Sequence, residues 1–450
     1  MGGRSWTSHE VAAALGVPSP AKLTFPSIST DTRHLTPGSL FVALKGENFD
    51  AHNFLAKAKE QGATAAVVRR GTAPVPGLAF FEVDDTLEAL GLLARARRRM
   101  LPEGTPVVAI TGSSGKTSTK EMIRAALGAR YRVHATSKNL NNRIGVPLTI
   151  LSAPDDTEAL VVEAGASVPG EIAKLRDIIE PTIAVITNIG YAHVEGFGSL
   201  EGVMAEKLSL LDGAPVAILG PGPDAMWAEA RRRTQVIPAA LSGKSGDDSL
   251  LDRYLDEGGH PRLPLDSGEQ ITLPALGIHQ LENAQIALAV AQRAGVDHDA
   301  AVRALAGVLL PEGRGDVREI GSLLVIDDSY NANPASMRRA VQTAAWLARR
   351  QRRPLVVVVG TMLELGPESA RLHAEAARDI AERKPALVAA VGTFARAFES
   401  LREDLGGRLI TAADANALGP RLKSALRGNE LVLLKASRGV ALEQVLRYIA

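Results

Sequence analysis

The stretch VVAITGSSGKTS, residues 107–118, joins a buried-strand pattern to a glycine loop, and a helical pattern from Thr119 to Leu127 follows it. Strand, glycine loop and helix in this order are typical of a loop that binds phosphate groups. The glycines let backbone N–H groups approach phosphate oxygens, and the lysine can reach the β- and γ-phosphates. The loop is a short variant, because Ile110 stands where the general motif has its first glycine. We predict that it binds a nucleoside triphosphate through Gly112, Ser113, Ser114, Gly115, Lys116, Thr117 and Ser118.

Short apolar runs alternate with helical patterns on both sides of this loop, which is the βαβ signature of a parallel sheet covered by helices. In the middle of the chain these runs are 107–110, 160–162, 183–186 and 216–219. The last third repeats the pattern at 323–326, 355–359, 387–391 and 431–434. We therefore expect two separate α/β sheets after residue 100.

Two joints rich in proline and glycine, at 101–106 and 310–315, divide the chain. A length of 450 residues is about three times the usual domain size of roughly 150 residues. The sequence predicts an α/β protein of three domains: a small α/β domain (1–102), a central parallel-sheet domain with the phosphate loop (103–311), and a doubly wound, Rossmann-like domain (312–450).

Composition excludes several classes of function. The chain has 51 basic and 50 acidic residues, so its net charge of +1 gives no electrostatic reason to bind nucleic acid or an anionic membrane. Cysteine is absent, which excludes disulfides, thiolate zinc sites and a cysteine nucleophile. Neither a signal peptide nor an apolar run of about 18 residues is present. We expect a cytoplasmic protein, a monomer, that acts on small molecules.

Two basic clusters, residues 95–99 and 349–353, could suggest contact with nucleic acid. Each lies where a predicted helix ends. We interpret both as solvated last turns whose cations oppose the negative end of the helix dipole.

Two side chains at strand ends are candidate metal ligands. Glu163 closes the run 160–163, and His193 follows the run 183–186, so both should lie at the edge of the sheet where α/β proteins bind their ligands. Residue type alone leaves the alternative open that each is an ordinary solvated loop residue.

Lys207 lies on a predicted helix, 201–212, and borders the apolar stripe of Met204, Leu208 and Leu211. The lysine could lay its stem on apolar surface and keep its ammonium in water. Alternatively, burial could lower its pKa, so that the neutral amine takes up CO₂ and becomes a carbamate, an anionic metal ligand.

Together these motifs resemble the Mur ligases of peptidoglycan synthesis. The resemblance covers essentially the whole chain, and it is sharpest to members that join D-alanyl-D-alanine to a UDP-linked muramoyl tripeptide. It rests on residues 111–117, 139–147, 188–199 with Lys207, 327–334, and 360–366 with His373. It implies a cytoplasmic, ATP-dependent ligase that works through an acyl phosphate and uses one or two Mg²⁺ ions.

The resemblance also assigns roles to individual residues. Thr117, Glu163, His193 and a carbamylated Lys207 would hold Mg²⁺, and Lys116, Lys207 and His193 would serve catalysis. ATP would also contact Asn283, Arg314 and Asp328. The UDP substrate would contact Ser29, Asp31, Arg33, Gly46, His52, Asn139 and Asn141. The incoming dipeptide would lie near Tyr330, Asn331 and Asn333.

Two alanines depart from the family pattern, because Ala51 and Ala436 replace its usual glycines. If either position needs a positive φ, alanine would cost about 1 kcal/mol there. Two other functions stay open at this point. One is the sister ligase that adds the third, diamino residue, although its Asp-Asn-Pro-Arg motif is not found. The other is an ATP-driven switch that forms no bond.

Overall fold

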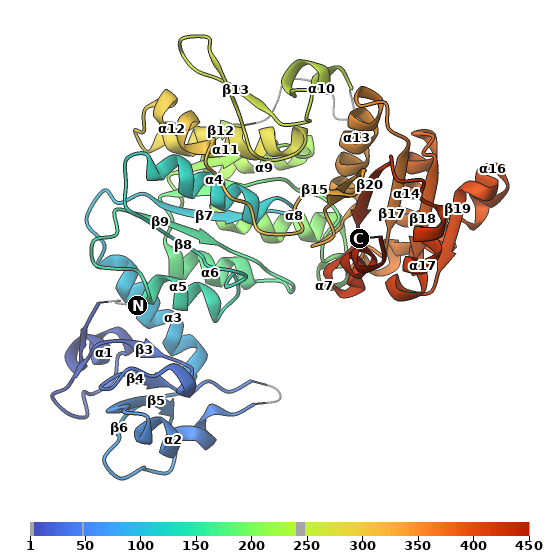
Figure 1. Cartoon of the computed structure of the whole chain (residues 1–450). Helices are drawn as coiled ribbons and strands as arrows, with labels where there is room; N and C mark the ends of the chain where they lie inside the picture. The colour runs from blue at the N-terminus through green and yellow to red at the C-terminus, as the bar shows by residue number, and fades with distance from the viewer. Residues whose placement is uncertain (1–3, 47–48, 240–247, 450) are drawn as a thin grey trace.

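The computed structural model describes residues 4–46, 49–239 and 248–449, and it is a mixed α/β structure built around three larger sheets (Figure 1). One sheet is formed by residues before 84, one by residues 107–238 and one by residues 316–435. Each falls within one of the three predicted segments. Within these ranges, no helix combines the length and the apolar character needed to cross a bilayer.

The central sheet has six parallel strands in the order β12-β11-β10-β7-β9-β8. The strand that enters the glycine loop lies inside the sheet, and every one of its residues is buried. Helices pack on both faces, so the sheet separates two apolar cores. The strands are β7 (Val107–Thr111), β8 (Val133–Ala135), β9 (Ala159–Glu163), β10 (Ile183–Ile186), β11 (Val216–Leu219) and β12 (Gln235–Pro238).

One face of this sheet is covered by the helix that follows the glycine loop, together with two later helices, and the other face by helices from the middle of the segment. The first group consists of α4 (Lys116–Gly128), α11 (Ile278–Arg293) and α12 (His298–Leu305). The second consists of α5 (Gly145–Leu151), α6 (Glu171–Ile179), α7 (Val194–Phe197) and α8 (Leu200–Leu208).

The N-terminal sheet has four parallel strands in sequence order, β3-β4-β5-β6. Its last helix, α3 (Thr86–Arg99), also packs against α5 and α6 and so connects the first domain to the second (Figure 1). The strands are β3 (Ile28–Ser29), β4 (Leu40–Val42), β5 (Ala65–Arg69) and β6 (Ala79–Val83). The remaining elements are β1 (Trp6–Thr7), β2 (Thr24–Phe25), α1 (Ser8–Leu15) and α2 (Leu55–Glu60).

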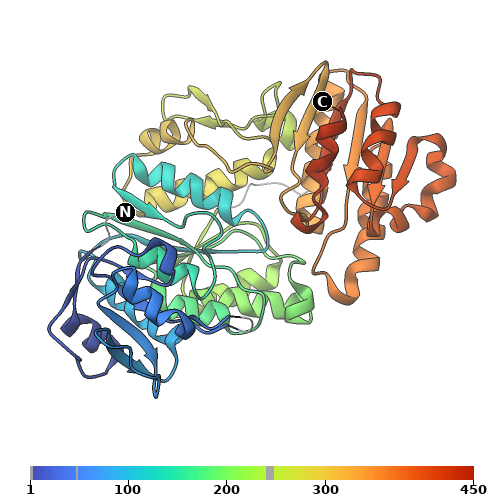
Figure 2. The same cartoon turned by 60° about the horizontal axis from the view of Figure 1, so that its bottom comes forward.

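The C-terminal sheet has the order β15-β16-β20-β17-β18-β19, parallel except for the edge strand β15. Helices on both faces make it doubly wound, as the sequence predicts, and the rotated view shows it as a separate body (Figure 2). Its strands are β15 (Asp316–Ile320), β16 (Leu323–Asp327), β17 (Leu355–Val359), β18 (Leu387–Val391), β19 (Leu409–Ala412) and β20 (Leu431–Lys435). Its longer helices are α13 (Pro334–Arg350), α14 (Ser369–Glu382) and α17 (Ala415–Ala425).

One helix of the central segment packs with the C-terminal domain. Leu251 of α10 (Ser249–Tyr254) and Leu255, which follows this helix, belong to the same apolar core as Trp346 of α13. The indole Nε1 of Trp346 donates to Asp252 at 2.9 Å, and Asp248 accepts hydrogen bonds from Gln342, Arg349 and Arg383. Residues 248–255 therefore pack with the C-terminal domain, although they precede the predicted domain boundary at residue 312.

Two local expectations differ from the structure. The helix predicted over 201–212 ends at Leu208 and continues as a 3₁₀ turn, Ser209–Leu211. The alanines that replace family glycines carry no strain, because neither Ala51 nor Ala436 is among the residues with positive φ. Both are buried, so the small side chain suits their packing.

The prediction of solvated arginines at 95–99 is wrong for Arg97, although Arg99 is exposed as predicted. Arg97 is 2% exposed and donates to the carbonyl oxygens of Ala153 and Pro154. Its neighbours Arg95 and Arg99 both pair with the Glu180 carboxylate, while Arg98 donates to two carbonyl oxygens. The cluster therefore attaches α3 to the central domain.

Two arginines of the second cluster, residues 349–353, also contact neighbouring segments. Arg349 pairs with Asp248 at 2.8 Å, and Arg353 donates to the carbonyl oxygen of Ser322 at 2.6 Å. These contacts join α13 to α10 and to the start of β16, whereas Arg349, Arg350 and Arg352 stay exposed, as predicted for the last turn of a helix.

The Arg97→Met variant tests this attachment. Methionine keeps much of the buried volume but leaves two carbonyl oxygens without their donor, so the free energy of unfolding should fall by about 2 kcal/mol. Denaturant unfolding measures the change. Arg70→Met is the control, because Arg70 forms an exposed pair with Asp84 and should change stability by less than about 0.5 kcal/mol. Equal stability of the Arg97→Met variant and the parent would contradict a stabilising role for the buried hydrogen bonds of Arg97.

Candidate active site

The glycine loop has the geometry its sequence predicts. Gly112 has φ +153°, and a Cβ added there would lie 1.9 Å from Oγ1 of Thr187. Gly115 has φ +77° and immediately precedes α4. No side chain caps that helix, so the N–H groups of its first turn are left for an anion.

A residue of the neighbouring strand end holds the loop. Asn188 follows β10; its carbonyl oxygen accepts the N–H of Ser113, and its Oδ1 accepts the N–H of Ser114. Its amide group donates in return to the oxygens of Ser114. These four hydrogen bonds hold the loop in its conformation.

Three basic side chains, Lys116, Lys207 and His193, lie near one another. Lys116 donates to the carbonyl oxygen of Gly112 at 2.9 Å. Burial lowers the pKa of Lys116, and the charge of Glu163 opposes that shift. Burial, with a further contribution from Lys116, lowers the pKa of Lys207 to about 7. The pKa of His193 is also lowered, mainly by burial.

Lys207 is therefore buried with a lowered pKa, as the formation of a carbamate would require. The carbamate itself stays a prediction. Lys207 is 1% exposed, and its ammonium makes no hydrogen bond or ion pair within the described ranges. Lys120, which is equally buried, donates to the carbonyl oxygen of Thr136 and pairs with Glu121. Burial without a partner favours the neutral amine of Lys207.

The residues around Glu163 fit a divalent cation. The carboxylate is 2% exposed; Oε1 accepts a hydrogen bond from Asn141, whereas the buried Oε2 has no partner in the described structure. A buried carboxylate oxygen without a donor is costly unless a cation neutralises it. Carboxylate, hydroxyl and imidazole groups from Glu163, Thr117 and His193 form a donor set that suits Mg²⁺ and similar ions.

Asn283, a predicted contact of ATP, lies in the first half of α11. The Asn283 amide accepts from Thr119 at 3.1 Å and donates to Gln280 at 2.9 Å. Its Oδ1 lies 2.8 Å from where a Cβ on Gly115 would stand, so Asn283 is held against the phosphate loop. Next to it, Glu282 pairs with Arg339 of α13 at 2.8 Å.

C-terminal residues close over the loop. Arg314 donates to Oγ1 of Thr117 at 3.1 Å, and its guanidinium lies over the ring of Tyr330 at 4.3 Å. Asn333, the N-cap of α13, donates to the carbonyl oxygen of Ser113. The two domains therefore meet at the phosphate loop.

Asp328 and Asn331 are held by one buried lysine. Lys435 pairs with Asp328 at 2.6 Å and donates to the carbonyl oxygen of Asn331. Burial raises the pKa of Asp328, and the charge of Lys435 opposes that shift.

A cavity of about 930 Å³ joins most of these groups. Its lining includes the loop, the metal candidates and the C-terminal residues: Ser113, Ser114, Gly115, Lys116, Thr117, Ser118, Asn139, Asn141, Glu163, His193, Asn283, Arg314, Asp328, Tyr330, Asn331 and Asn333. The volume is ample for a nucleotide.

The remaining UDP-side residues lie in the N-terminal domain and do not line this cavity. Asp31 caps a 3₁₀ turn and accepts hydrogen bonds from Arg33, which lower its pKa, while Ser29 bonds to Asp31. The N–H of Gly46 donates to the carbonyl oxygen of Phe49. Both ring nitrogens of His52 are engaged, with Asp50 and with the N–H of Arg69. Their contact with UDP stays a prediction.

Some site residues were missed from the sequence. Asn188 could have been found, because it follows a strand end beside the loop. Arg339, Lys435 and Glu364 could not, because only the packing of the C-terminal domain brings Arg339 and Lys435 to the cavity and Glu364 to His193.

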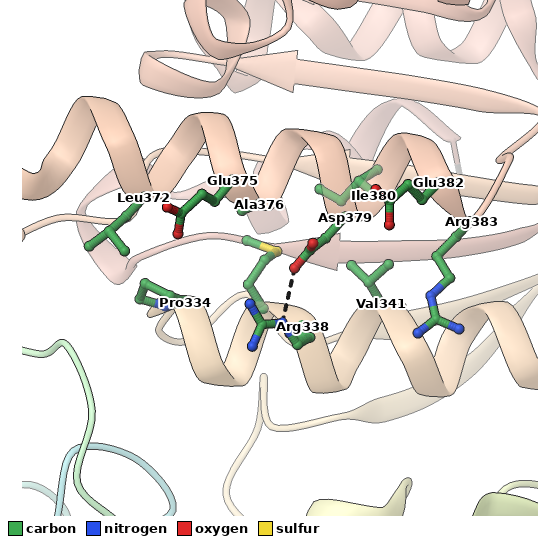
Figure 3. Close-up of a pocket in the computed structure, with 11 residues that line it drawn as sticks. Pro334, Arg338, Val341, Leu372, Glu375, Ala376, Asp379, Ile380, Glu382 and Arg383 are labelled. Atoms are coloured by element: carbon green, nitrogen blue, oxygen red, sulfur yellow. Dashed lines mark hydrogen bonds and ion pairs between the residues drawn. The ribbon is translucent and has the colours of Figure 1, made fainter. Parts of the chain in front are cut away.

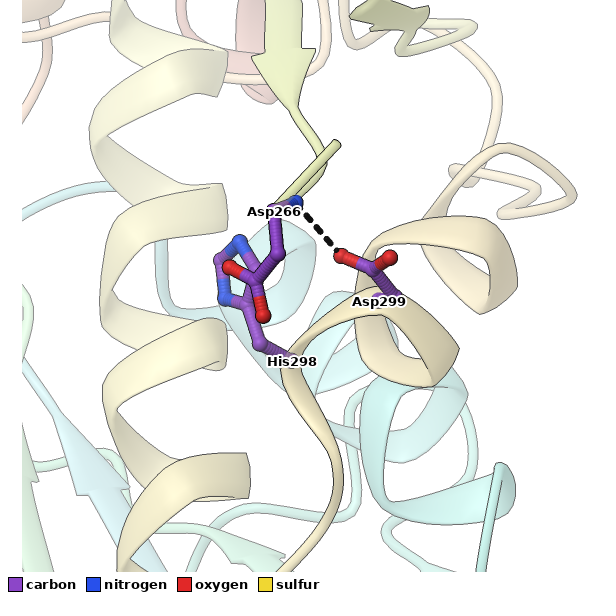
Figure 4. A group of neighbouring side chains, drawn as sticks. All are labelled: Asp266, His298 and Asp299. Carbon is purple, nitrogen blue, oxygen red and sulfur yellow. Dashed lines mark hydrogen bonds between the residues drawn. The ribbon is translucent and has the colours of Figure 1, made fainter. Parts of the chain in front are cut away.

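Two other features lie away from this site. A cavity of about 110 Å³ between α13 and α14 is lined by apolar side chains and by the ion pair of Arg338 with Asp379 (Figure 3). Asp266, His298 and Asp299 form an exposed cluster (Figure 4). In it, Asp299 accepts the N–H of Asp266 and His298 bonds to the carbonyl oxygen of Pro264, so the cluster attaches the hairpin β13 (Arg262–Pro264) and β14 (Gln270–Thr272) to α12.

Gly112→Ala should abolish the phosphate loop's function. The new methyl group would overlap the Thr187 hydroxyl, so β7 and β10 could not keep their spacing, and affinity for a non-hydrolysable ATP analogue should fall at least about tenfold. Titration calorimetry measures the loss. Gly128→Ala is the control, because nothing lies within 4 Å of a Cβ there. Normal affinity in Gly112→Ala would contradict the close contact.

Comparison with known proteins places the whole chain in one family. Residues 24–98 match the description "Mur ligase family, catalytic domain", residues 110–291 match the Mur ligase middle domain, and residues 313–438 match the glutamate ligase domain of Mur ligases. The matched segments coincide with the three sheets and include the phosphate loop.

Relatives that match over nearly the whole chain belong to the same family. The UDP-N-acetylmuramoyl-tripeptide–D-alanyl-D-alanine ligase of Bacillus subtilis is 35% identical over 444 residues, 97% of this chain and 96% of the relative. The Escherichia coli enzyme of the same name is 37% identical over 438 residues, 95% and 94% of the two chains.

Solved structures share the fold. MurF of Acinetobacter baumannii superposes with a TM-score of 0.86 at 31% identity, covering 100% of this chain and 99% of its own. MurF of Thermotoga maritima, solved in complex with ADP, gives 0.81 at 29% identity, with 94% and 96% covered. The chain belongs to the Mur ligase family.

Proposed function

We propose that this protein is an ATP-dependent ligase that adds D-alanyl-D-alanine to UDP-N-acetylmuramoyl-tripeptide, a step of peptidoglycan precursor synthesis. The observation that carries the proposal is the single cavity in which the phosphate loop, a buried unpaired carboxylate and C-terminal residues meet. The names of the full-length relatives support the choice of acid and amine.

The chemistry requires activation of the acid. A free carboxylate does not acylate an amine at neutral pH, because oxide is a poor leaving group. An oxygen of the tripeptide carboxylate attacks the γ-phosphorus, and ADP leaves. The dipeptide amine then attacks the acyl carbon, phosphate leaves, and the amine loses a proton as the amide forms.

The residues of the cavity, together with Lys207 next to His193 and Lys116, serve these steps. Lys116 and the N–H groups at the start of α4 stabilise charge on the phosphoryl oxygens. Thr117, Glu163, His193 and a carbamylated Lys207 would hold Mg²⁺, which supplies further charge neutralisation. Tyr330, Asn331 and Asn333 lie on the C-terminal side, where we place the dipeptide. Binding the two substrates on separate domains brings the reacting groups together, and contact between the domains excludes water from the acyl phosphate.

The UDP group would bind the N-terminal domain through Ser29, Asp31, Arg33, Gly46 and His52, with Asn139 and Asn141 nearer the reacting end. ATP would use the phosphate loop, Asn283, Arg314 and Asp328. We place the reaction in the cytoplasm, with the protein acting as a monomer and without nucleic acid or membrane as a partner.

A coupled phosphate-release assay tests the reaction. With ATP and UDP-muramoyl tripeptide, phosphate release should require D-alanyl-D-alanine, and Lys116→Ala should lower the rate by at least about a hundredfold because a charge-stabilising donor is lost. Omission of each substrate is the control. Amine-independent ATP turnover would support a switch instead, and turnover with a diamino acid but not with the dipeptide would support the sister ligase.

The carbamate has its own test. The neutral Lys207 amine attacks the carbon of CO₂ and releases a proton, so protein equilibrated with ¹³C-bicarbonate should show one carbamate carbonyl resonance by NMR. Lys207→Met should remove it. Lys120→Met is the matched control, because Lys120 is buried but hydrogen-bonded, and the resonance should remain. A resonance that persists in Lys207→Met would rule out this site.

A further inference from the structure

The loop of residues 361–366, which follows β17, contains a backbone conformation rare for its residue type. Glu364 has φ +63°, the left-handed region that non-glycine residues seldom adopt. Residues held in such conformations concentrate at functional sites, where surrounding contacts fix them. We name residues 361–366 the Glu364 loop.

Buried residues of the C-terminal domain hold the Glu364 loop. The N–H of Met362 donates to Nε2 of His373, whose Nδ1–H donates to the carbonyl oxygen of Ser369. The N–H of Leu363 donates to Oγ of Ser437 at 2.9 Å. His373 is fully buried and engaged at both nitrogens, so it acts on the loop's position and does not contact substrate.

The loop crosses to the central domain. Oε2 of Glu364 lies 2.7 Å from Nδ1 of His193, and the carbonyl oxygen of Glu364 accepts the N–H of Glu195. A Cβ on Gly366 would lie 3.2 Å from Cα of Glu195, so the backbones are in close contact at the start of α7. The carboxylate is thereby brought to the imidazole of a different domain.

The imidazole ring of His193 must be oriented if its Nε2 is to face the cavity. His193 has φ +55°, and no hydrogen bond of its buried Nδ1 is formed among the described residues, although Oε2 of Glu364 lies within hydrogen-bond distance at 2.7 Å. A small rotation of the ring completes that bond and commits Nε2 to the cavity. Histidines that bind metals usually donate their other N–H to a carboxylate or carbonyl, and this fixes both the ring and its tautomer.

We infer that Glu364 is a positioning residue for the metal site: its carboxylate accepts the Nδ1–H of His193 and so turns Nε2 toward a divalent cation. Because Glu364 belongs to the C-terminal domain, tight metal binding depends on the contact between that domain and the central one. The inference rests on the proposed role of His193 as a metal ligand.

A purely structural ion pair is the alternative, and it explains less. Glu364 is 54% exposed at its side chain, and exposed pairs contribute between nothing and about 1 kcal/mol to stability. Such a pair gives no reason to hold a glutamate at positive φ, where glycine would be less strained.

Binding of Mn²⁺, followed by electron paramagnetic resonance of the free ion in the presence of a non-hydrolysable ATP analogue, tests the inference. Glu364→Gly removes the carboxylate and suits the positive φ, so the unfolding temperature should stay at or above that of the parent. Its Mn²⁺ affinity should fall about 10–100-fold, the usual effect of losing the partner of a metal-bound histidine. Glu364→Gln, which keeps an acceptor oxygen, should retain most of the affinity.

Two further variants separate the possible failures. Glu368→Gln removes the next acidic side chain, which pairs with Arg371, and should leave Mn²⁺ affinity unchanged. His193→Ala should abolish tight binding. Parental affinity in His193→Ala would overturn both the metal assignment and this inference. If His193→Ala loses Mn²⁺ while Glu364→Gly binds normally, or if Glu364→Gln loses as much as Glu364→Gly, only the orienting role is overturned.

Discussion

The close approach of Gly112 to Thr187 is the constraint on which the rest of the structure depends. Because no side chain stands between them, the carboxyl ends of β7 and β10 lie side by side, and Asn188 at the end of β10 can hold the phosphate loop by its backbone. The same meeting of strand ends brings Lys116, Glu163 and His193 to one edge of the sheet. Their shared position follows from the parallel topology, which gathers the carboxyl ends of neighbouring strands.

Much of the architecture could be predicted from the sequence. The four apolar runs of the middle segment and the four of the last segment correspond to β7, β9, β10, β11, β16, β17, β18 and β20. These are buried on both faces, so they appear as continuous apolar stretches. Edge strands were missed: β12 and β15 have exposed or partly exposed residues and lack that pattern.

The site was predictable to the extent that its residues lie near a strand end or the glycine loop. Burial of Lys207, the main cause of its lowered pKa, could be anticipated from the apolar stripe it borders, whereas the further contribution of the nearby Lys116 could not be read from the helix pattern. The arginines at 95–99 were misjudged for a related reason. Charged residues at a helix end usually face water, and only the packing of α3 on the central domain shows that Arg97 is enclosed. Contacts between domains, such as that of Glu364 with His193, cannot be predicted from the local sequence pattern around either residue.

The packing of α10 bears on how such proteins can be recombined. Leu251 and Leu255 precede the C-terminal sheet by more than sixty residues in the chain, yet they complete its apolar core. If relatives exchanged their C-terminal segments at the joint near residue 312, each C-terminal domain would pack against the α10 of the other protein. Its apolar surface would then face side chains to which it is not fitted. A chimera that also carries residues 248–255 preserves the native partner of Trp346. In this protein the exchangeable unit is thus discontinuous in the chain, formed by two stretches that the phosphate-loop domain separates.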